Sequence, residues 1–317
     1  MEKLLEDRTA QCDPACPDEI VVATDLADAE RLIPYAVAQA RLSGAALTFV
    51  HAMPPDQSLD ARAGVSSLEG QSGASDSRKD AMEEIARRVR AQGISCSTVV
   101  NAGPVADVVA EILRRTGAGR LIVGTHARQG VDKLLVGSVA RKLLESVDVP
   151  VFIVGPQCKG ASQTWTLRRI LVASSTLEQN APKTVVADAI AMHCHAELTV
   201  LHVLVPSRPA TRRTRPAQIQ TLTEPIMKAH DEGTGQLAFT RVTAGDPAVE
   251  IVRVANEISA DLIVLGVHHY PFRLPFGKET TAYKVLASAP CPVLTLKSDS
   301  ALIRKHALTV TRHLAVQ

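Results

Sequence analysis

Short apolar runs alternate along the first half of the chain with segments in which apolar residues recur at helical spacing. The apolar runs have the length of buried strands, and the intervening helical segments are typical of parallel strands joined by crossover helices. The pattern predicts strands at 19–24, 46–51, 95–101, 120–125 and 150–154, and helices at 28–42, 77–92, 104–116 and 137–146. We therefore expect an α/β fold with a doubly wound, five-stranded parallel sheet.

The same pattern occurs twice. The segment DEIVVATDL, which begins at Asp18, recurs as RRILVASST, and AALTFVHAM recurs as AELTVLHVL. The first pair is offset by 150 residues, and from Gly103 onward the offset is 142, as for Gly124 and Gly266. The shorter offset places a deletion between the second and third strands of the second copy.

Two copies of one fold therefore fill the chain. We expect a first domain at 1–155 and a second domain at 166–317, with the second ending in a tail from residue 298. The segment GPQCKGASQTW, which starts at Gly155, is expected to be the linker between them.

Composition and charge restrict the partners of such a chain. The 317 residues are 46% hydrophobic, and 35 basic residues nearly balance 33 acidic ones. This balance predicts no strong attraction to nucleic acid. Neither a span of about 20 apolar residues nor the apolar core of a secretory signal is found, so we expect no membrane partner and a cytoplasmic location.

The stretch GTHARQGVDKLLVGSV points to a phosphate site. An apolar strand ends at Gly124, and thirteen positions later Gly137 and Ser138 open a predicted helix. The start of a helix presents unpaired backbone N–H groups and partial positive charge, which attract an anion. The sequence therefore predicts a nucleotide pocket in the first copy.

The segment at 54–76, PPDQSLDARAGVSSLEGQSGASD, is rich in Gly, Ser and Pro. This composition predicts a loop beside the expected pocket, which we interpret as a lid. A nucleotide that ordered this lid would change a surface seen by another protein.

The sequence resembles universal stress proteins in four features. These are the VATD end of the first strand, the LTFVHA second strand, the glycine loop with its GS pair, and the closing VPV and CPV strands. The resemblance covers both copies and implies a tandem, two-domain member with flavodoxin-like domains. It implies ATP or AMP beyond the carboxyl ends of the strands, Mg²⁺ as a companion ion, and a regulatory protein that acts through conformation and protein partners.

The resemblance also assigns site residues in the first copy. These are Asp25 for ribose or metal, Ala52, Val123 and Gly124 against the nucleotide, and Ala127, Arg128, Gly137, Ser138 and Val139 around the phosphates. A helix cap at Asp25, turn packing at Gly124 and a solvated charge at Arg128 remain open as alternatives. Ala127 replaces the second glycine of the family pattern, and Ala52 replaces a valine, so both weaken the expected affinity.

The second copy departs further from the pattern. Ser175 stands in place of Asp25, and Glu279 and Thr280 stand in place of the Gly-Ser pair. A carboxylate there repels phosphate, so we expect a degenerate domain. The resemblance implies an intramolecular pseudo-dimer in which PVFIV and PVLTL meet; whether two chains pair further into a homodimer stays open.

Two other classes of function remain as alternatives. A metal or redox sensor would use the Cys and His residues, namely Cys12, Cys16, His193, Cys194, His195, His202, His268 and His269. Zinc needs about four converging ligands, and adjacent residues of a helix point apart, so zinc is disfavoured. A dedicated enzyme is disfavoured because the first crevice offers only Asp25, His51 and His126 as catalytic groups, without a GxSxG or GK[ST] motif.

Overall fold

The structure is a computed structural model. It describes residues 13–53, 68–125, 138–158, 165–174, 182–205, 238–267, 280–297, 300 and 303. Among the helices in these ranges, none combines the length and apolar character needed to cross a membrane.

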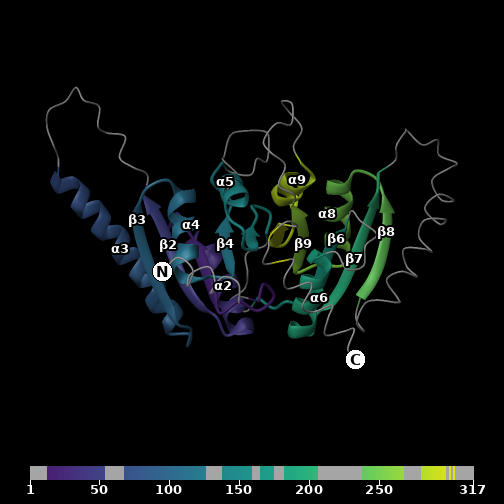
Figure 1. The fold of residues 1–317 in the computed structure, drawn as a ribbon, viewed down its shortest axis with the longest axis horizontal. Helices are drawn as coiled ribbons and strands as arrows, with labels where there is room; N and C mark the ends of the chain where they lie inside the picture. Colours follow the sequence, from purple (N-terminus) through teal and green to yellow (C-terminus); the bar gives the residue numbers. More distant parts are fainter. Residues whose placement is uncertain are drawn as a thin grey trace, which may run out of the picture.

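Strands and helices alternate in both halves of the chain. The first half, as we use the term, runs from β1 to β5, with the elements β1 (Glu19–Ala23), α2 (Ala29–Ser43), β2 (Ala46–Met53), α3 (Leu68–Arg90), β3 (Cys96–Ala102), α4 (Val105–Thr116), β4 (Arg120–Gly124), α5 (Ser138–Ser146) and β5 (Val151–Val154). The second half contains β6 (Arg169–Ser174), α6 (Pro182–Cys194), β7 (Glu197–Leu204), β8 (Ala238–Ala244), α8 (Pro247–Glu257), β9 (Leu262–Val267), α9 (Thr281–Ser288) and β10 (Val293–Lys297). Figure 1 shows the two halves side by side.

All ten strands join in one sheet with the order β3-β2-β1-β4-β5-β10-β9-β6-β7-β8. The neighbours within each half are parallel, for example β1 with β2 and with β4. Among the described strands, only β5 and β10 pair in the antiparallel sense, with Leu294 opposite Phe152. The predicted meeting of the two last strands is therefore confirmed, and each half is doubly wound as expected.

Helices cover both faces of this sheet. One core cluster packs α2, α3 and α6 on one face, and a second packs α4, α5, α8 and α9 on the other. Each cluster contains strand residues from both halves, such as Phe152 with Leu294. Because alternate strand residues face opposite layers, both faces of every central strand must be apolar, which explains the Val, Ile and Leu runs.

The seam between the halves is tightly packed. The rings of Tyr35, Phe152 and Trp165 form a cluster with centroid separations of 5.4–6.0 Å. A Cβ added at Gly155 would lie 2.8 Å from the backbone oxygen of Leu286 on α9, so this position needs glycine for the close approach. The pseudo-dimer is thus closed by apolar, aromatic and backbone contacts.

The prediction of a loop over residues 54–76 is wrong in part. Helix α3 begins at Leu68, well before the predicted start at residue 77, so the end of the 54–76 segment is helical. Once a helix is nucleated each further residue adds a hydrogen bond, which outweighs the weak propensity of residues such as Gly70 and Ser72. Residues 54–67 lie outside the described residues.

Candidate functional site

The expected site lies where β2, β1 and β4 end. In the sheet, β1 lies between β2 and β4. The chain passes from β1 to β2 on one side, and it later returns to add β4 on the other side of β1. Such a change of direction leaves a crevice beyond the carboxyl ends of parallel strands, where ligands of doubly wound sheets bind. Asp25 follows β1, Ala52 lies near the end of β2, and Gly124 ends β4. The fold therefore brings these three predicted residues to one edge.

Asp25 shapes the turn into α2. Its side chain is exposed, and its Oδ1 accepts a hydrogen bond from the backbone N–H of Asp28 at 3.1 Å. Between them, Leu26 has a φ of 74°. Asp25 therefore closes the turn before the helix, whereas the N-cap residue of α2 is Asp28. An exposed carboxylate beside the crevice still suits contact with a ribose hydroxyl or a cation.

Behind this turn lies a buried polar group that the sequence did not reveal. Thr24 and Asp28 are 7% and 5% exposed, and the Thr24 hydroxyl donates to Oδ1 of Asp28 at 2.6 Å. The Thr24 hydroxyl also accepts from the N–H of Leu26 at 3.0 Å. The buried His51 ring donates from Nδ1 to the backbone oxygen of Thr24 at 3.0 Å. His51 therefore supports the turn.

Gly124 has a structural reason to be glycine. A Cβ at this position would lie 2.2 Å from Oδ2 of Asp28 and 3.2 Å from a guanidinium nitrogen of Arg31. The Asp28 carboxylate thus sits against the backbone of β4 on the α2 face. The turn-packing alternative accounts for Gly124 without any ligand. Val123, its neighbour, is buried in the other core layer.

Arg31 joins the ends of β4 and β5. Its guanidinium donates to the backbone oxygens of Thr125 at 2.8 Å, Gly155 at 3.2 Å and Val154 at 3.4 Å. The oxygens of Val154 and Gly155 also accept from the backbone N–H groups of Thr125 and Cys158, and the arginine adds charge-assisted hydrogen bonds to them. A single side chain from α2 therefore fixes one rim of the crevice.

The phosphate end of the expected site is described only from α5 onward. Ser138 is the first residue of α5, one residue after the predicted start at 137, and the side chain of Val139 is 45% exposed while Ala140 is buried. The crossover from β4 to β5 makes α5 run opposite to the strands, so its N-terminal end lies on the carboxyl side of the sheet. Ala127, Arg128 and Gly137 lie outside the described residues.

In the second half, the described residues at the corresponding strand ends include the strands and the start of α9 but not the loops between them. His202 on β7 is 3% exposed, like its counterpart His51, and Thr280 precedes α9 without a side-chain cap. Ser175, Glu279, His268 and His269 lie outside the described ranges. The predicted loss of the phosphate cradle in this half therefore stays a prediction.

Comparison with known proteins assigns the family. The sequence profile of the universal stress protein family matches residues 18–155 and again residues 166–297. The chain belongs to the universal stress protein family. The two matches support the tandem arrangement and an intramolecular pair of domains.

A curated relative is the universal stress protein MJ0531 of Methanocaldococcus jannaschii, 24% identical over 76 residues, or 24% of this chain and 45% of that protein. The chain therefore aligns with less than half of that relative. A solved universal stress protein from Archaeoglobus fulgidus shares the fold, with a TM-score of 0.64, 20% identity and coverage of 88% of this chain and 96% of that one. Another from the same organism, solved with dAMP, is 20% identical over 42% of this chain and all of its own, with a TM-score of 0.31.

Two residues of the sensor alternative, Cys16 and His193, lie against each other at the seam between the halves. Sγ of Cys16 lies 3.9 Å from Nε2 of His193, which donates to the backbone oxygen of Leu42 at 2.6 Å. Burial raises the pKa of both Cys16 and Cys194. Within the described ranges, no group of three metal-binding side chains is found. The five cysteines in those ranges, Cys16, Cys96, Cys158, Cys194 and Cys291, are free thiols.

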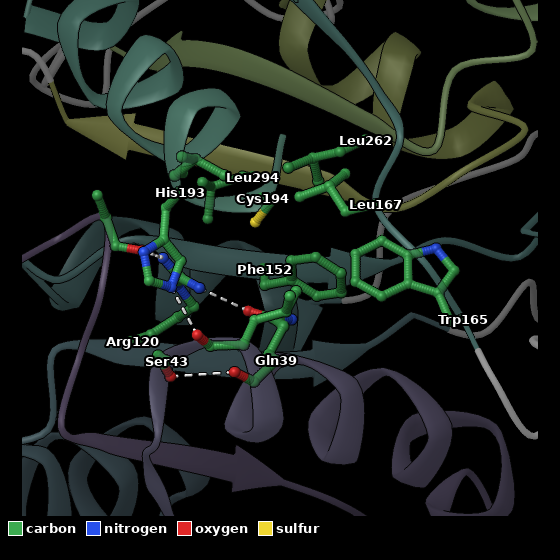
Figure 2. A pocket seen from close by; sticks show the side chains of 13 residues that line it. Gln39, Ser43, Arg120, Phe152, Trp165, Leu167, His193, Cys194, Leu262 and Leu294 are labelled. Carbon is green, nitrogen blue, oxygen red and sulfur yellow. Dashed lines mark hydrogen bonds between the residues drawn. The ribbon is translucent and has the colours of Figure 1, made fainter. Parts of the chain in front are cut away.

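A small cavity also opens at this seam, toward the starts of β4 and β9 (Figure 2). The Arg120 guanidinium donates to Oε1 of Gln39 at 2.8 Å and to the backbone oxygen of Pro14 at 2.7 Å. The space measures about 20 Å³ for water-sized molecules. That volume holds about one water molecule, so this cavity is not the nucleotide site.

Proposed function

We propose that this chain is a regulatory universal stress protein whose first domain, residues 1–155, binds ATP or AMP beyond the carboxyl ends of β1 and β4. The second domain, residues 166–317, binds no nucleotide and serves as its structural partner. The protein acts through conformation and protein contacts in the cytoplasm, and not as a dedicated enzyme.

One observation carries the proposal: the first turn of α5 lies on the carboxyl side of the sheet with Val139 45% exposed. Four N–H groups at a helix start have no partner within the helix, and the helix dipole adds partial positive charge. A triphosphate or monophosphate supplies the acceptors. Gly137 would allow close approach of the phosphate, and Ser138 would add a hydroxyl donor.

The other end of the ligand would meet the rim described above. Asp25 is exposed at the end of β1 and would contact a ribose hydroxyl or an accompanying Mg²⁺. Ala52, partly buried on β2, offers a small apolar contact for adenine. The methyl groups lost relative to valine cost about 1–2 kcal/mol of apolar burial, so we expect modest affinity.

Isothermal calorimetry tests the proposal with the parent chain, Gly137→Glu and the control Gln92→Glu. Gly137→Glu imitates the second copy, whereas Gln92 follows α3 at the opposite end of the sheet. We expect the parent and the control to bind ATP alike, with at least a tenfold loss in Gly137→Glu. Absence of binding to the parent, or equal affinity in all three proteins, would contradict the proposal.

A further inference from the structure

The far end of α5 is held by the second half of the chain. Lys297 on β10 is 7% exposed, and its Nζ donates to the backbone oxygen of Glu145 at 2.9 Å. The same Nζ lies 3.4 Å from Oδ1 of Asp148. Glu145 is among the last residues of α5, so its carbonyl has no partner within the helix. An ammonium group placed here satisfies that carbonyl and opposes the negative end of the helix dipole.

A second contact holds the side of the same helix. The Arg141 guanidinium lies over the ring of Tyr283 on α9, 4.8 Å from its centroid. The Tyr283 hydroxyl donates to Oε1 of Glu145 at 3.5 Å. Just beyond the helix, the hydroxyl of Ser300 donates to the backbone oxygen of Asp148 at 3.0 Å. Three residues of the second half thus fix the last turn of α5 and the segment after it.

Among the described residues, the Lys297 contact has no equivalent in the opposite direction. Under the 142-residue offset Lys297 corresponds to Gly155, and Glu145 corresponds to Ala287. Gly155 approaches the backbone of α9 with no side chain at all. The second half therefore places a cation at the end of α5, whereas the matching position of the first half, Gly155, offers only backbone to α9.

We propose that Lys297 and Tyr283 are positioning residues for the phosphate end of the first-half nucleotide site, an inference that rests on the proposed function. Helix α5 has nine residues and spans about 13 Å, so it moves as one rigid segment. Its start would meet the phosphates, while its end is fixed by the other half. The second domain is then not a passive partner, because it sets where the phosphate-binding amides lie.

The test compares the affinities for ATP and adenosine in Lys297→Met, Tyr283→Leu, the conservative Lys297→Arg and the control Lys284→Met. Lys284 lies on α9 next to Tyr283 in sequence and pairs with Asp246 at the start of α8. A displaced α5 weakens contacts to phosphate and leaves adenosine contacts unchanged. General destabilisation would affect both ligands.

We expect the ratio of ATP to adenosine affinity to fall about fivefold or more in Lys297→Met and Tyr283→Leu, to fall less in Lys297→Arg, and to be unchanged in Lys284→Met. If Lys297→Met does not fold, Tyr283→Leu decides the matter. An unchanged ratio in the folded variants, with the parent still preferring ATP, overturns this inference and leaves the proposed function standing. A parent without preference for ATP over adenosine overturns both.

Discussion

Replacing Gly124 by alanine tests the buried polar group at the strand edge. The new Cβ would lie 2.2 Å from Oδ2 and 3.1 Å from Cγ of Asp28. Neither distance is compatible with van der Waals contact, so the carboxylate must move. That movement breaks the 2.6 Å hydrogen bond from Thr24 and crowds Arg31, which holds the ends of β4 and β5.

The expected cost follows from these contacts. A buried hydrogen bond to a charged group contributes about 1.5–3 kcal/mol. Overpacking adds about 1–3 kcal/mol, while replacing glycine within a strand returns up to about 1 kcal/mol. We expect Gly124→Ala to lower the free energy of unfolding by about 2–4 kcal/mol.

Denaturant unfolding followed by fluorescence measures this change. Trp165 is the single tryptophan of the chain and packs against Tyr35 and Phe152, so its emission reports unfolding at the seam. The same substitution made in an Asp28→Ala background removes the clash and should cost less than about 1 kcal/mol. A parent-like stability for Gly124→Ala, or an undiminished cost without the Asp28 carboxylate, would refute the reasoning.

Three further outcomes are expected. Gly155→Ala should destabilise the chain by about 1–3 kcal/mol in the same unfolding assay, because its Cβ would lie 2.8 Å from the Leu286 backbone oxygen; a neutral effect would contradict the close seam. The N–H groups of Val249 and Ala248 lower the pKa of the Asp246 carboxyl. This helix cap therefore stabilises the folded protein fully at pH values above the ordinary pKa of Asp, and the stabilisation is lost as the pH falls through the lowered pKa. Asp246→Ala should therefore cost about 1 kcal/mol at pH 7 and progressively less in acid, and a pH-independent cost would disagree. Burial raises the pKa of Cys158 to about 11, so iodoacetamide at pH 8 should modify the half-buried Cys16 and Cys194 before Cys158, as mass spectrometry can check; equally fast labelling of Cys158 in the folded protein would count against it.

The repeated apolar pattern predicts most of the fold because buried parallel strands need apolar residues on both faces. The strands around Val21 and Ile122 followed from that requirement, whereas the meeting of Phe152 with Leu294 was implied by the family resemblance. Helix α3 was placed too late, since the weak propensities of its first residues are overridden by helix propagation.

The candidate site was predictable only in part. The family resemblance assigned Asp25, Ala52 and Gly124 to the site, and the fold brings them to one edge because neighbouring parallel strands end there. Asp28 and Arg31 were missed, because nothing in their local sequence shows that α2 carries them to the backbone of β4. The sequence signal nearest to this contact was Gly124 itself, which had a functional and a packing interpretation.

The central claim is that nucleotide binds at the start of α5 and not at the start of α9. Amide hydrogen exchange with and without saturating ATP tests it most directly. We predict slower exchange at residues 137–139 and unchanged exchange at 280–282. Protection confined to the second half, or absent from both helix starts, would contradict the account.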